Sequence, residues 1–171
     1  NLSFAFSITE IFGINKTKFI NALKSFRGLP HRQEVFLKKG NIKFINDSKA
    51  TSFESSKYAL NSNDNIIWIL GGLPKKNDKI VIDKFRKKII KAYIIGKHPN
   101  FFSRQLKKGV KFEIIKNLKT VIGKIFKETK KKEKLTVLFS PASASFDQFK
   151  NFSERGDIFK KLVKQYAKRY N

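Results

Sequence analysis

The stretch Ile45-Asn46-Asp47-Ser48-Lys49-Ala50-Thr51 decides how this chain is organised. It follows the alternating apolar run 42–45, which is typical of a strand, and it precedes residues 53–60, which are typical of a helix. Such a strand end places a carboxylate, an ammonium group and hydroxyl groups at the carboxyl edge of a sheet, where open α/β sheets bind ligands. The alternative is a polar turn in which Asp47 or Ser48 caps the following helix. This stretch alone leaves both interpretations open.

Strands alternate with helices on the carboxyl side of this stretch, and the alternation predicts the fold class. The expected strands lie at about 33–38, 42–46, 65–70, 91–95, 112–115 and 135–139, and the expected helices at about 52–62, 79–89, 99–108, 117–129 and 155–169. The turn between the first two strands is typical of an antiparallel hairpin. We therefore expect an α/β fold with a mostly parallel, Rossmann-like sheet of about six strands, flanked by helices.

The residues before this alternation form a separate region. Residues 1–12 and 16–26 show helical spacing of their apolar side chains, and a loop rich in Gly and Pro follows at 27–32. We expect a domain boundary at this loop, with residues 1–26 on one side and 27–171 on the other. The chain begins with Asn and contains no Met, so we also expect it to be part of a longer protein.

Composition bounds the function classes. With 171 residues, 40% hydrophobic and 13% aromatic, the chain is long and apolar enough to bury a core. The absence of Cys from the sequence excludes disulfides and thiolate metal sites, and two His far apart in sequence do not predict a metal site. No apolar segment is long enough to predict a membrane span.

The formal net charge of +25 raises the question of nucleic-acid binding. Only six of the 38 basic residues are Arg, the residue best suited to bidentate phosphate and base contacts, and the remaining 32 are Lys spread along the chain. We interpret this as a compositional bias with Lys on solvated faces, and we do not expect nucleic-acid binding. A free-standing basic α/β module that binds nucleotide or nucleic acid is kept as the alternative function.

Three further polar clusters lie beside predicted strands. They are Gly28-Leu29-Pro30-His31-Arg32, Gly71-Gly72-Leu73-Pro74-Lys75-Lys76, and the Ser-rich stretch 140–152. Each has a structural alternative, namely a solvated loop, a turn with surface lysines, or a loop that caps the last helix. Neither a Walker phosphate loop nor a G-x-G-x-x-G fingerprint occurs in the sequence. Four polar clusters in one mostly parallel sheet favour a single ligand-binding edge.

These motifs together resemble one protein family. The resemblance is carried by Gly28-Leu29-Pro30-His31-Arg32, Asn46-Asp47-Ser48-Lys49-Ala50-Thr51, Gly71-Gly72 with Lys75, Ser140-Pro141-Ala142-Ser143-Ala144-Ser145-Phe146-Asp147-Gln148-Phe149, Asn151-Phe152 and Arg155-Gly156. Over essentially its whole length the chain resembles the carboxyl-terminal part of the D-glutamate-adding branch of the Mur ligase family. The resemblance implies that residues 1–26 are the last helices of a central ATP-binding domain and that 27–171 are the C-terminal domain.

The resemblance implies an ATP-dependent acid–D-amino-acid ligase, which joins D-glutamate to UDP-N-acetylmuramoyl-L-alanine through an acyl phosphate and releases ADP and phosphate. It places the protein in peptidoglycan synthesis, cell wall biogenesis, cell shape and cell division, in the bacterial cytoplasm. ATP and Mg²⁺ would be bound mainly by a central domain that carries the phosphate loop and is missing here. We therefore expect this chain to be inactive alone, with the enzyme's own N-terminal and central domains as partners in a monomer.

The resemblance also assigns roles to residues at matching positions. His31, Arg32 and Lys49 would be catalytic, and nucleotide contacts would come from Asn1, His31, Arg32, Asp47 and Lys49. The D-glutamate pocket would contain Thr51, Lys75, Ser145, Phe146 and Phe152. No metal ligand is expected in this part of the family. Ser143 stands where the family commonly has Cys, which is a conservative change in size.

Overall fold

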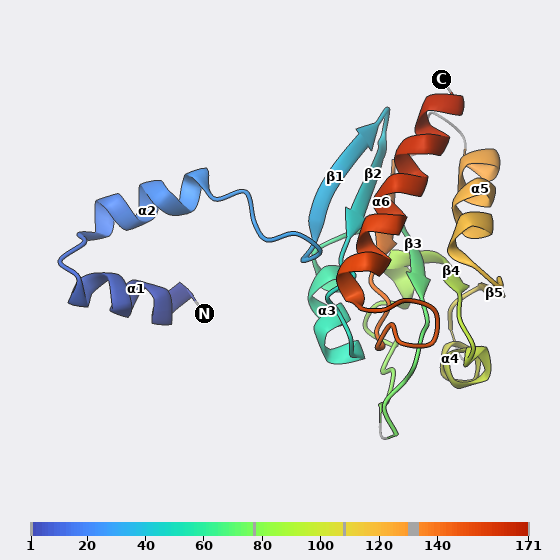
Figure 1. Cartoon of the computed structure of the whole chain (residues 1–171). Helices are drawn as coiled ribbons and strands as arrows, with labels where there is room; N and C mark the ends of the chain where they lie inside the picture. Colours follow the sequence, from blue (N-terminus) through green and yellow to red (C-terminus); the bar gives the residue numbers. More distant parts are fainter. Residues whose placement is uncertain (1, 77, 108, 130–133, 171) are drawn as a thin grey trace.

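A computed structural model describes residues 2–76, 78–107, 109–129 and 134–170 (Figure 1). Its helices are α1 (Leu2–Ile11), α2 (Lys16–Ser25), α3 (Phe53–Asn61), the 3₁₀ turn η1 (Arg86–Lys88), α4 (Pro99–Leu106), α5 (Leu118–Glu128) and α6 (Phe152–Arg169). Its strands are β1 (Glu34–Lys39), β2 (Ile42–Asn46), β3 (Ile66–Leu70), β4 (Ile89–Ile94), β5 (Phe112–Ile114) and β6 (Leu135–Phe139).

The strands form one six-stranded sheet in the order β1-β2-β6-β3-β4-β5. β1 and β2 pair antiparallel, and every other neighbouring pair is parallel. The predicted fold class is confirmed, including the hairpin at its start. Because β6 lies between β2 and β3, the loops that follow these three strands meet at one carboxyl edge of the sheet.

Helices cover both faces of the sheet and bury two apolar clusters (Figure 1). On one face, α3 and α4 pack on Trp68, Leu70 and Leu138. On the other face, α5 and α6 pack on Ile69 and neighbouring apolar strand residues. Successive residues of β3 alternate between the two clusters, which explains why this central strand is apolar without interruption.

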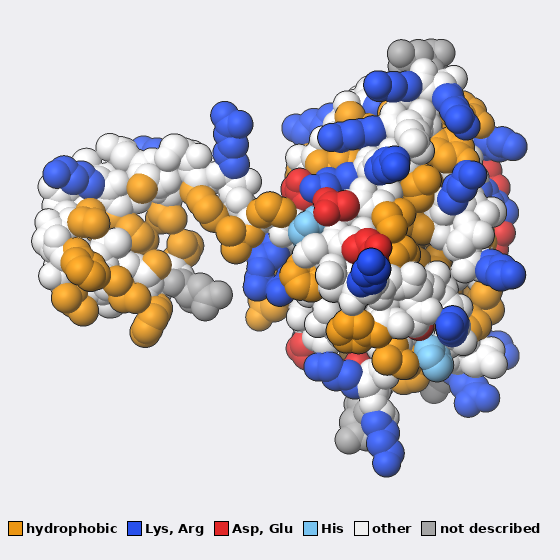
Figure 2. All heavy atoms as spheres, viewed as in Figure 1, with side chains coloured by type: hydrophobic (Ala, Val, Ile, Leu, Met, Phe, Trp, Pro, Cys, Tyr) orange, Lys and Arg blue, Asp and Glu red, His pale blue; other side chains and the backbone are white. Residues whose placement is uncertain are grey.

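The helices α1 and α2 pack on each other and lie apart from the sheet (Figure 1). The rings of Phe6 and Phe19 are 5.2 Å apart, yet neither helix contains a buried residue. The side chains of Phe4, Ile11 and Phe12 are 73%, 82% and 77% exposed. Figure 2 shows the apolar atoms gathered on this pair, whereas Lys and Arg are scattered over the body around the sheet. The predicted domain boundary at 27–32 stays a prediction.

The prediction of a helix at 79–89 is wrong. Residues 79–82 have no regular secondary structure, η1 is the only helical segment described in that range, and β4 already begins at Ile89. Three consecutive β-branched residues, Ile80-Val81-Ile82, are stiff and disfavour a helix. The chain instead buries Ile80 and Ile82 on one side and exposes Val81 on the other. Burial therefore alternates along these three residues with a period of two, and not with the period of a helix.

The last helix begins at Phe152 and not near 155. Asn151 caps it, because its side-chain oxygen accepts a hydrogen bond from the backbone N–H of Glu154 at 2.9 Å. This earlier start places both Phe152 and Arg155 in the first turn of α6, beside the carboxyl edge of the sheet.

Gly71 shows how closely the loops approach each other at this edge. It has φ +123°, and a Cβ atom there would lie 2.1 Å from the carbonyl oxygen of Ile95. We expect Gly71→Ala to lower the free energy of unfolding by about 2–4 kcal/mol, since neither strain nor overlap with backbone can relax cheaply. Urea unfolding measures this change.

Gly28→Ala is the matched control. Gly28 also has a positive φ of +82°, but no atom lies within 4 Å of the Cβ position. This variant therefore carries backbone strain alone, about 1–2 kcal/mol. Equal losses in the two variants would contradict close approach at Gly71.

Candidate functional site

A cavity of about 440 Å³ opens at the carboxyl edge of the sheet, next to the end of β2. Its lining comes from the entry to β1, the β2–α3 loop and α3, namely Arg32, Gln33, Asp47, Lys49, Ala50, Thr51, Ser55 and Tyr58. Four of the predicted site residues thus line one cavity, Arg32, Asp47, Lys49 and Thr51. The cavity combines two cations with one carboxylate and several hydroxyl groups.

Asp47 is the most strongly perturbed group of this cavity. Its Oδ2 accepts a hydrogen bond from the Ser140 hydroxyl at 2.6 Å, and its Oδ1 accepts one from the backbone N–H of Gln33 at 3.1 Å. Burial raises the pKa of Asp47 to about 6, although these two hydrogen bonds and the charge of Arg32 oppose the rise. Near neutral pH the carboxylate is ionised and can accept further hydrogen bonds from a ligand.

Lys49 and His31 meet the first turn of α6. The ammonium of Lys49 lies 3.8 Å from the centroid of the Phe152 ring, a cation–π contact that holds it in place. The imidazole of His31 is buried between Asn46, whose amide nitrogen is 2.9 Å from Nδ1, and Asp157, whose Oδ1 is 3.8 Å from Nε2. His31 therefore faces α6, whereas its neighbour Arg32 lines the cavity.

The loops that carry the predicted amino-acid pocket are tied to each other. Leu73 and Ala144 form an antiparallel bridge, with N–H···O distances of 2.9 and 3.1 Å. This bridge brings the loop of Lys75 beside that of Ser145. Lys75 is exposed, Ser145 is buried, and the ring of Phe146 is 71% exposed. Phe152 reaches the same edge from α6 and joins this region to Lys49.

Some predicted residues do not line the cavity itself. His31, Lys75, Ser145, Phe146 and Phe152 lie outside its lining, although their loops are adjacent or hydrogen-bonded to it. The predicted nucleotide contact Asn1 lies outside the described residues. Ser143 is buried, and its hydroxyl donates to the carbonyl of Pro141 at 3.1 Å.

Sequence reasoning missed several residues of this edge. Gln33, Ser55 and Tyr58 line the cavity. Ser140 belongs to a predicted polar cluster but had no predicted role, and its hydroxyl donates a hydrogen bond to Asp47. At an expected helix or strand end, the sequence does not distinguish a polar residue that lines a cavity from one that faces solvent. Arg155 was named only as part of a motif and not as a site residue, although its side chain is buried at this edge.

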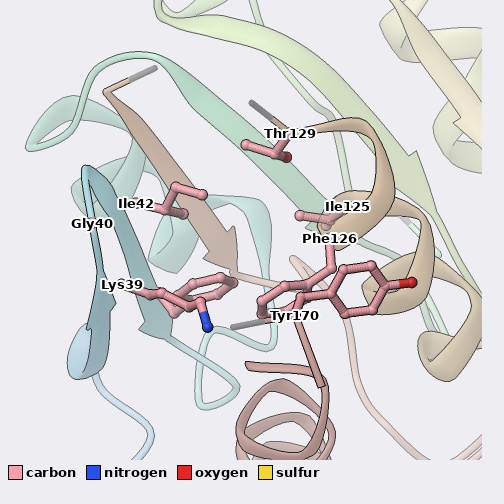
Figure 3. A pocket seen from close by; sticks show the side chains of 8 residues that line it. Lys39, Gly40, Ile42, Ile125, Phe126, Thr129 and Tyr170 are labelled. Carbon is pink, nitrogen blue, oxygen red and sulfur yellow. The ribbon is translucent and has the colours of Figure 1, made fainter. Parts of the chain in front are cut away.

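A second hollow, of about 370 Å³, lies at the opposite edge of the sheet. Figure 3 shows side chains of the β1–β2 hairpin, α5 and the end of α6 turned toward it, among them Ile42, Phe126 and Tyr170. The rings of Phe44 and Phe126 stack at 5.4 Å beneath it. It is mostly apolar, in contrast to the polar cavity at the carboxyl edge.

The described residues contain no cluster of three or more His, Cys, Asp and Glu side chains that could hold a metal ion. Within the same part of the chain, no helix is long and apolar enough to cross a membrane.

Comparison with known proteins identifies similar sequences. No family model matches the chain. It is 38% identical to a UDP-N-acetylmuramoylalanine–D-glutamate ligase of Wolbachia pipientis, over 100% of this chain and 33% of the relative. Ligases of the same name from Rickettsia felis and Rhizobium meliloti are 36% and 40% identical, over 98% and 93% of this chain and 38% and 35% of the relatives. The chain thus spans about a third of the length of these relatives.

Solved structures show the same fold at low sequence identity. MurF from Acinetobacter baumannii matches 95% of this chain and 37% of its own, with a TM-score of 0.67 and 12% identity. Folylpolyglutamate synthase from Thermotoga maritima matches 96% of this chain and 39% of its own, with a TM-score of 0.57 and 17% identity. The resemblance that the motifs indicated is confirmed by the named relatives, and the fold by these structures.

The raised pKa of Asp47 predicts how the free energy of unfolding changes with pH. The folded state binds this proton more tightly than the unfolded state, so Asp47 favours folding fully below its ordinary pKa of 3.8 and loses that contribution as the pH rises through about 6. A pKa raised by about two pH units corresponds to about 3 kcal/mol. Relative to Asp47→Asn, the wild type should lose up to about 3 kcal/mol of unfolding free energy between about pH 4 and pH 7. Urea unfolding of both proteins across this range measures the difference, and parallel pH profiles would contradict it.

Proposed function

We propose that this chain, whose whole length resembles about a third of the UDP-N-acetylmuramoylalanine–D-glutamate ligases, is the closing domain of such an enzyme. In the complete protein it would cooperate with an N-terminal and a central domain to join D-glutamate to UDP-N-acetylmuramoyl-L-alanine at the expense of ATP. Residues 27–171 would form the C-terminal domain, and α1 and α2 would be the last helices of the central domain. The observation that carries the proposal is the cavity that unites Arg32, Asp47, Lys49 and Thr51.

The cavity fits one side of a nucleotide. The guanidinium of Arg32 and the ammonium of Lys49 suit phosphate oxygens, and the ionised Asp47 suits the hydroxyl groups of a ribose. His31, which packs on α6, would hold Arg32 on this side of the cavity. Asn1 would approach the base of the nucleotide. Mg²⁺ would be held mainly by the central domain, in agreement with the donor set at this edge, where Asp47 is already engaged by Ser140 and Gln33.

The neighbouring loops fit an amino acid with two carboxylates. Lys75 supplies a cation, Thr51 and Ser145 supply hydroxyl groups, and Phe146 and Phe152 supply apolar walls. The exposed ring of Phe146 is available to be covered when the domain closes. Closure would place the attacking amine beside the activated carboxyl group and would exclude water, which otherwise hydrolyses an acyl phosphate.

In the proposed reaction, ATP supplies the phosphoryl group that activates the substrate carboxylate. Attack by the amine then forms the amide and releases phosphate. Negative charge develops in both steps, so His31, Arg32 and Lys49 would contribute by stabilising charge and orienting phosphate oxygens. None of these roles requires a nucleophile from this chain.

Phosphate release by the complete protein tests the proposal. With ATP, Mg²⁺ and UDP-N-acetylmuramoyl-L-alanine present, we expect release that depends on D-glutamate and not on L-glutamate or L-lysine. Dependence on a different amino acid would contradict the D-glutamate assignment. Absence of release from a folded complete protein would instead favour a basic α/β binding module.

Lys75→Ala tests the amino-acid pocket. Removing one partner of a desolvated charge pair costs about 2–5 kcal/mol, so kcat/KM for D-glutamate should fall by that equivalent while the KM for ATP changes little. Steady-state kinetics of the complete enzyme measure both values.

Lys76→Ala is the matched control, because Lys76 is an adjacent, exposed lysine of the same loop. We expect it to leave the D-glutamate kinetics nearly unchanged. Similar losses in the two variants would point to a general charge effect and contradict a specific role of Lys75.

A further inference from the structure

Arg155 is the most deeply buried charge of the described residues. It lies in the first turn of α6 and is only 1% exposed. Burial lowers its pKa to about 10, and the nearby carboxylate of Asp147 partly offsets this effect, so the guanidinium is charged near neutral pH. Burying a charge costs free energy unless its hydrogen-bond donors find acceptors. The acceptors of the Arg155 guanidinium therefore show which segments it holds.

The guanidinium binds two different loops of the candidate site. Its Nη2 donates to the carbonyl of Ser48 at 2.8 Å, and its Nε donates to the Ser48 hydroxyl at 3.0 Å. Its Nη1 donates to the carbonyl of Ser143 at 3.1 Å. The fork of Arg155 thus joins the loop after β2 to the loop after β6, in addition to the bond from the Ser140 hydroxyl to Asp47 and the bond from the backbone N–H of Asp47 to the carbonyl of Phe139.

The loop after β2 carries the proposed nucleotide contacts Asp47 and Lys49 and also Thr51, whereas the loop after β6 carries Ser145 and Phe146 of the proposed amino-acid pocket. Ser48 lies between Asp47 and Lys49, on the nucleotide side, whereas Ser143 precedes Ser145, on the amino-acid side. The Ser48 hydroxyl also donates to the backbone carbonyl of Phe152 at 2.7 Å, the residue whose ring contacts Lys49. A change in the placement of Arg155 would therefore change the distance between the two halves.

We propose that Arg155 is a positioning residue that sets the nucleotide half and the amino-acid half of the site in their mutual geometry. It touches neither ligand, and it acts through Ser48 and Ser143. This inference rests on the proposed ligase function. It assigns to α6 a role in catalysis beyond covering the sheet.

Arg155→Lys in the complete enzyme tests the proposal. Lysine keeps the charge but replaces the planar fork by a single ammonium, which cannot hold both loops in the same geometry. Because each half stays intact, we expect affinity for ADP and KM for UDP-N-acetylmuramoyl-L-alanine to change little. We expect kcat to fall by about tenfold to a hundredfold, the scale for a misplacement of about 1 Å between reacting groups.

Val163→Ala separates positioning from stability. Val163 is a fully buried residue of α6 that packs in the cluster away from the site. This variant should lower the melting temperature without lowering kcat when both variants are assayed well below unfolding. Equal kcat losses in Val163→Ala and Arg155→Lys at matched stability, or unchanged kcat in Arg155→Lys, would overturn the proposal.

Ser48→Ala tests the proposed role of Arg155 if Arg155→Lys does not fold. It removes the hydroxyl bonds to Arg155 and Phe152 but keeps the carbonyl bond at Ser48, and we expect a fall in kcat of about fivefold with ADP affinity retained. Unchanged kcat in this folded variant would also overturn the proposal. Wild-type enzyme is assayed first, since absence of D-glutamate-dependent phosphate release there would contradict the proposed function and not the role of Arg155.

Discussion

A positive charge buried at the amino end of α6 constrains the whole carboxyl edge of the sheet. Arg155 loses its hydration there, and the fold tolerates this only because carbonyl and hydroxyl oxygens of two loops replace the water. The dependence is mutual, since the same carbonyl groups of Ser48 and Ser143 would otherwise be buried without donors. Loop geometry and helix position are therefore fixed together, in a region that lies beyond the ends of β2 and β6.

The first turn of α6 extends this constraint to the residues before β1. Asn46 donates to the carbonyl of Gly156 at 3.4 Å and approaches the imidazole of His31, which packs directly on the helix backbone. A Cβ atom at position 156 would lie 2.3 Å from Nδ1 of His31. The residues before β1, after β2 and after β6 are thus placed against one helical turn. This turn therefore helps to position Lys49, which contacts Phe152, and Arg32, which follows His31.

The sequence predicted the fold well because its signals are local. Alternating apolar residues and turn residues located all six strands. Arg32, Asp47 and Thr51 lie at one cavity on the carboxyl edge, and the roles that the sequence assigned to them stay predictions. The error at 79–89 arose because three β-branched residues mixed with polar ones fit a helical spacing as readily as an extended one. The partners of the two buried charges lie far apart in sequence: Arg155 binds Ser48, 107 residues away, and Asp47 binds Ser140, 93 residues away. No local sequence pattern encodes these contacts.

Total charge and local placement have different consequences for such a site. Lys and Arg are spread over the body around the sheet (Figure 2), so their combined field can attract anions and speed their arrival. At physiological ionic strength this field is screened within about 8 Å, and it cannot distinguish one phosphate oxygen from another. Orientation has to come from groups that are held: Lys49 against the ring of Phe152, and Asp47 between Ser140 and Gln33. Many lysines can therefore be exchanged without consequence for the proposed reaction, whereas the buried contacts that hold a few side chains cannot.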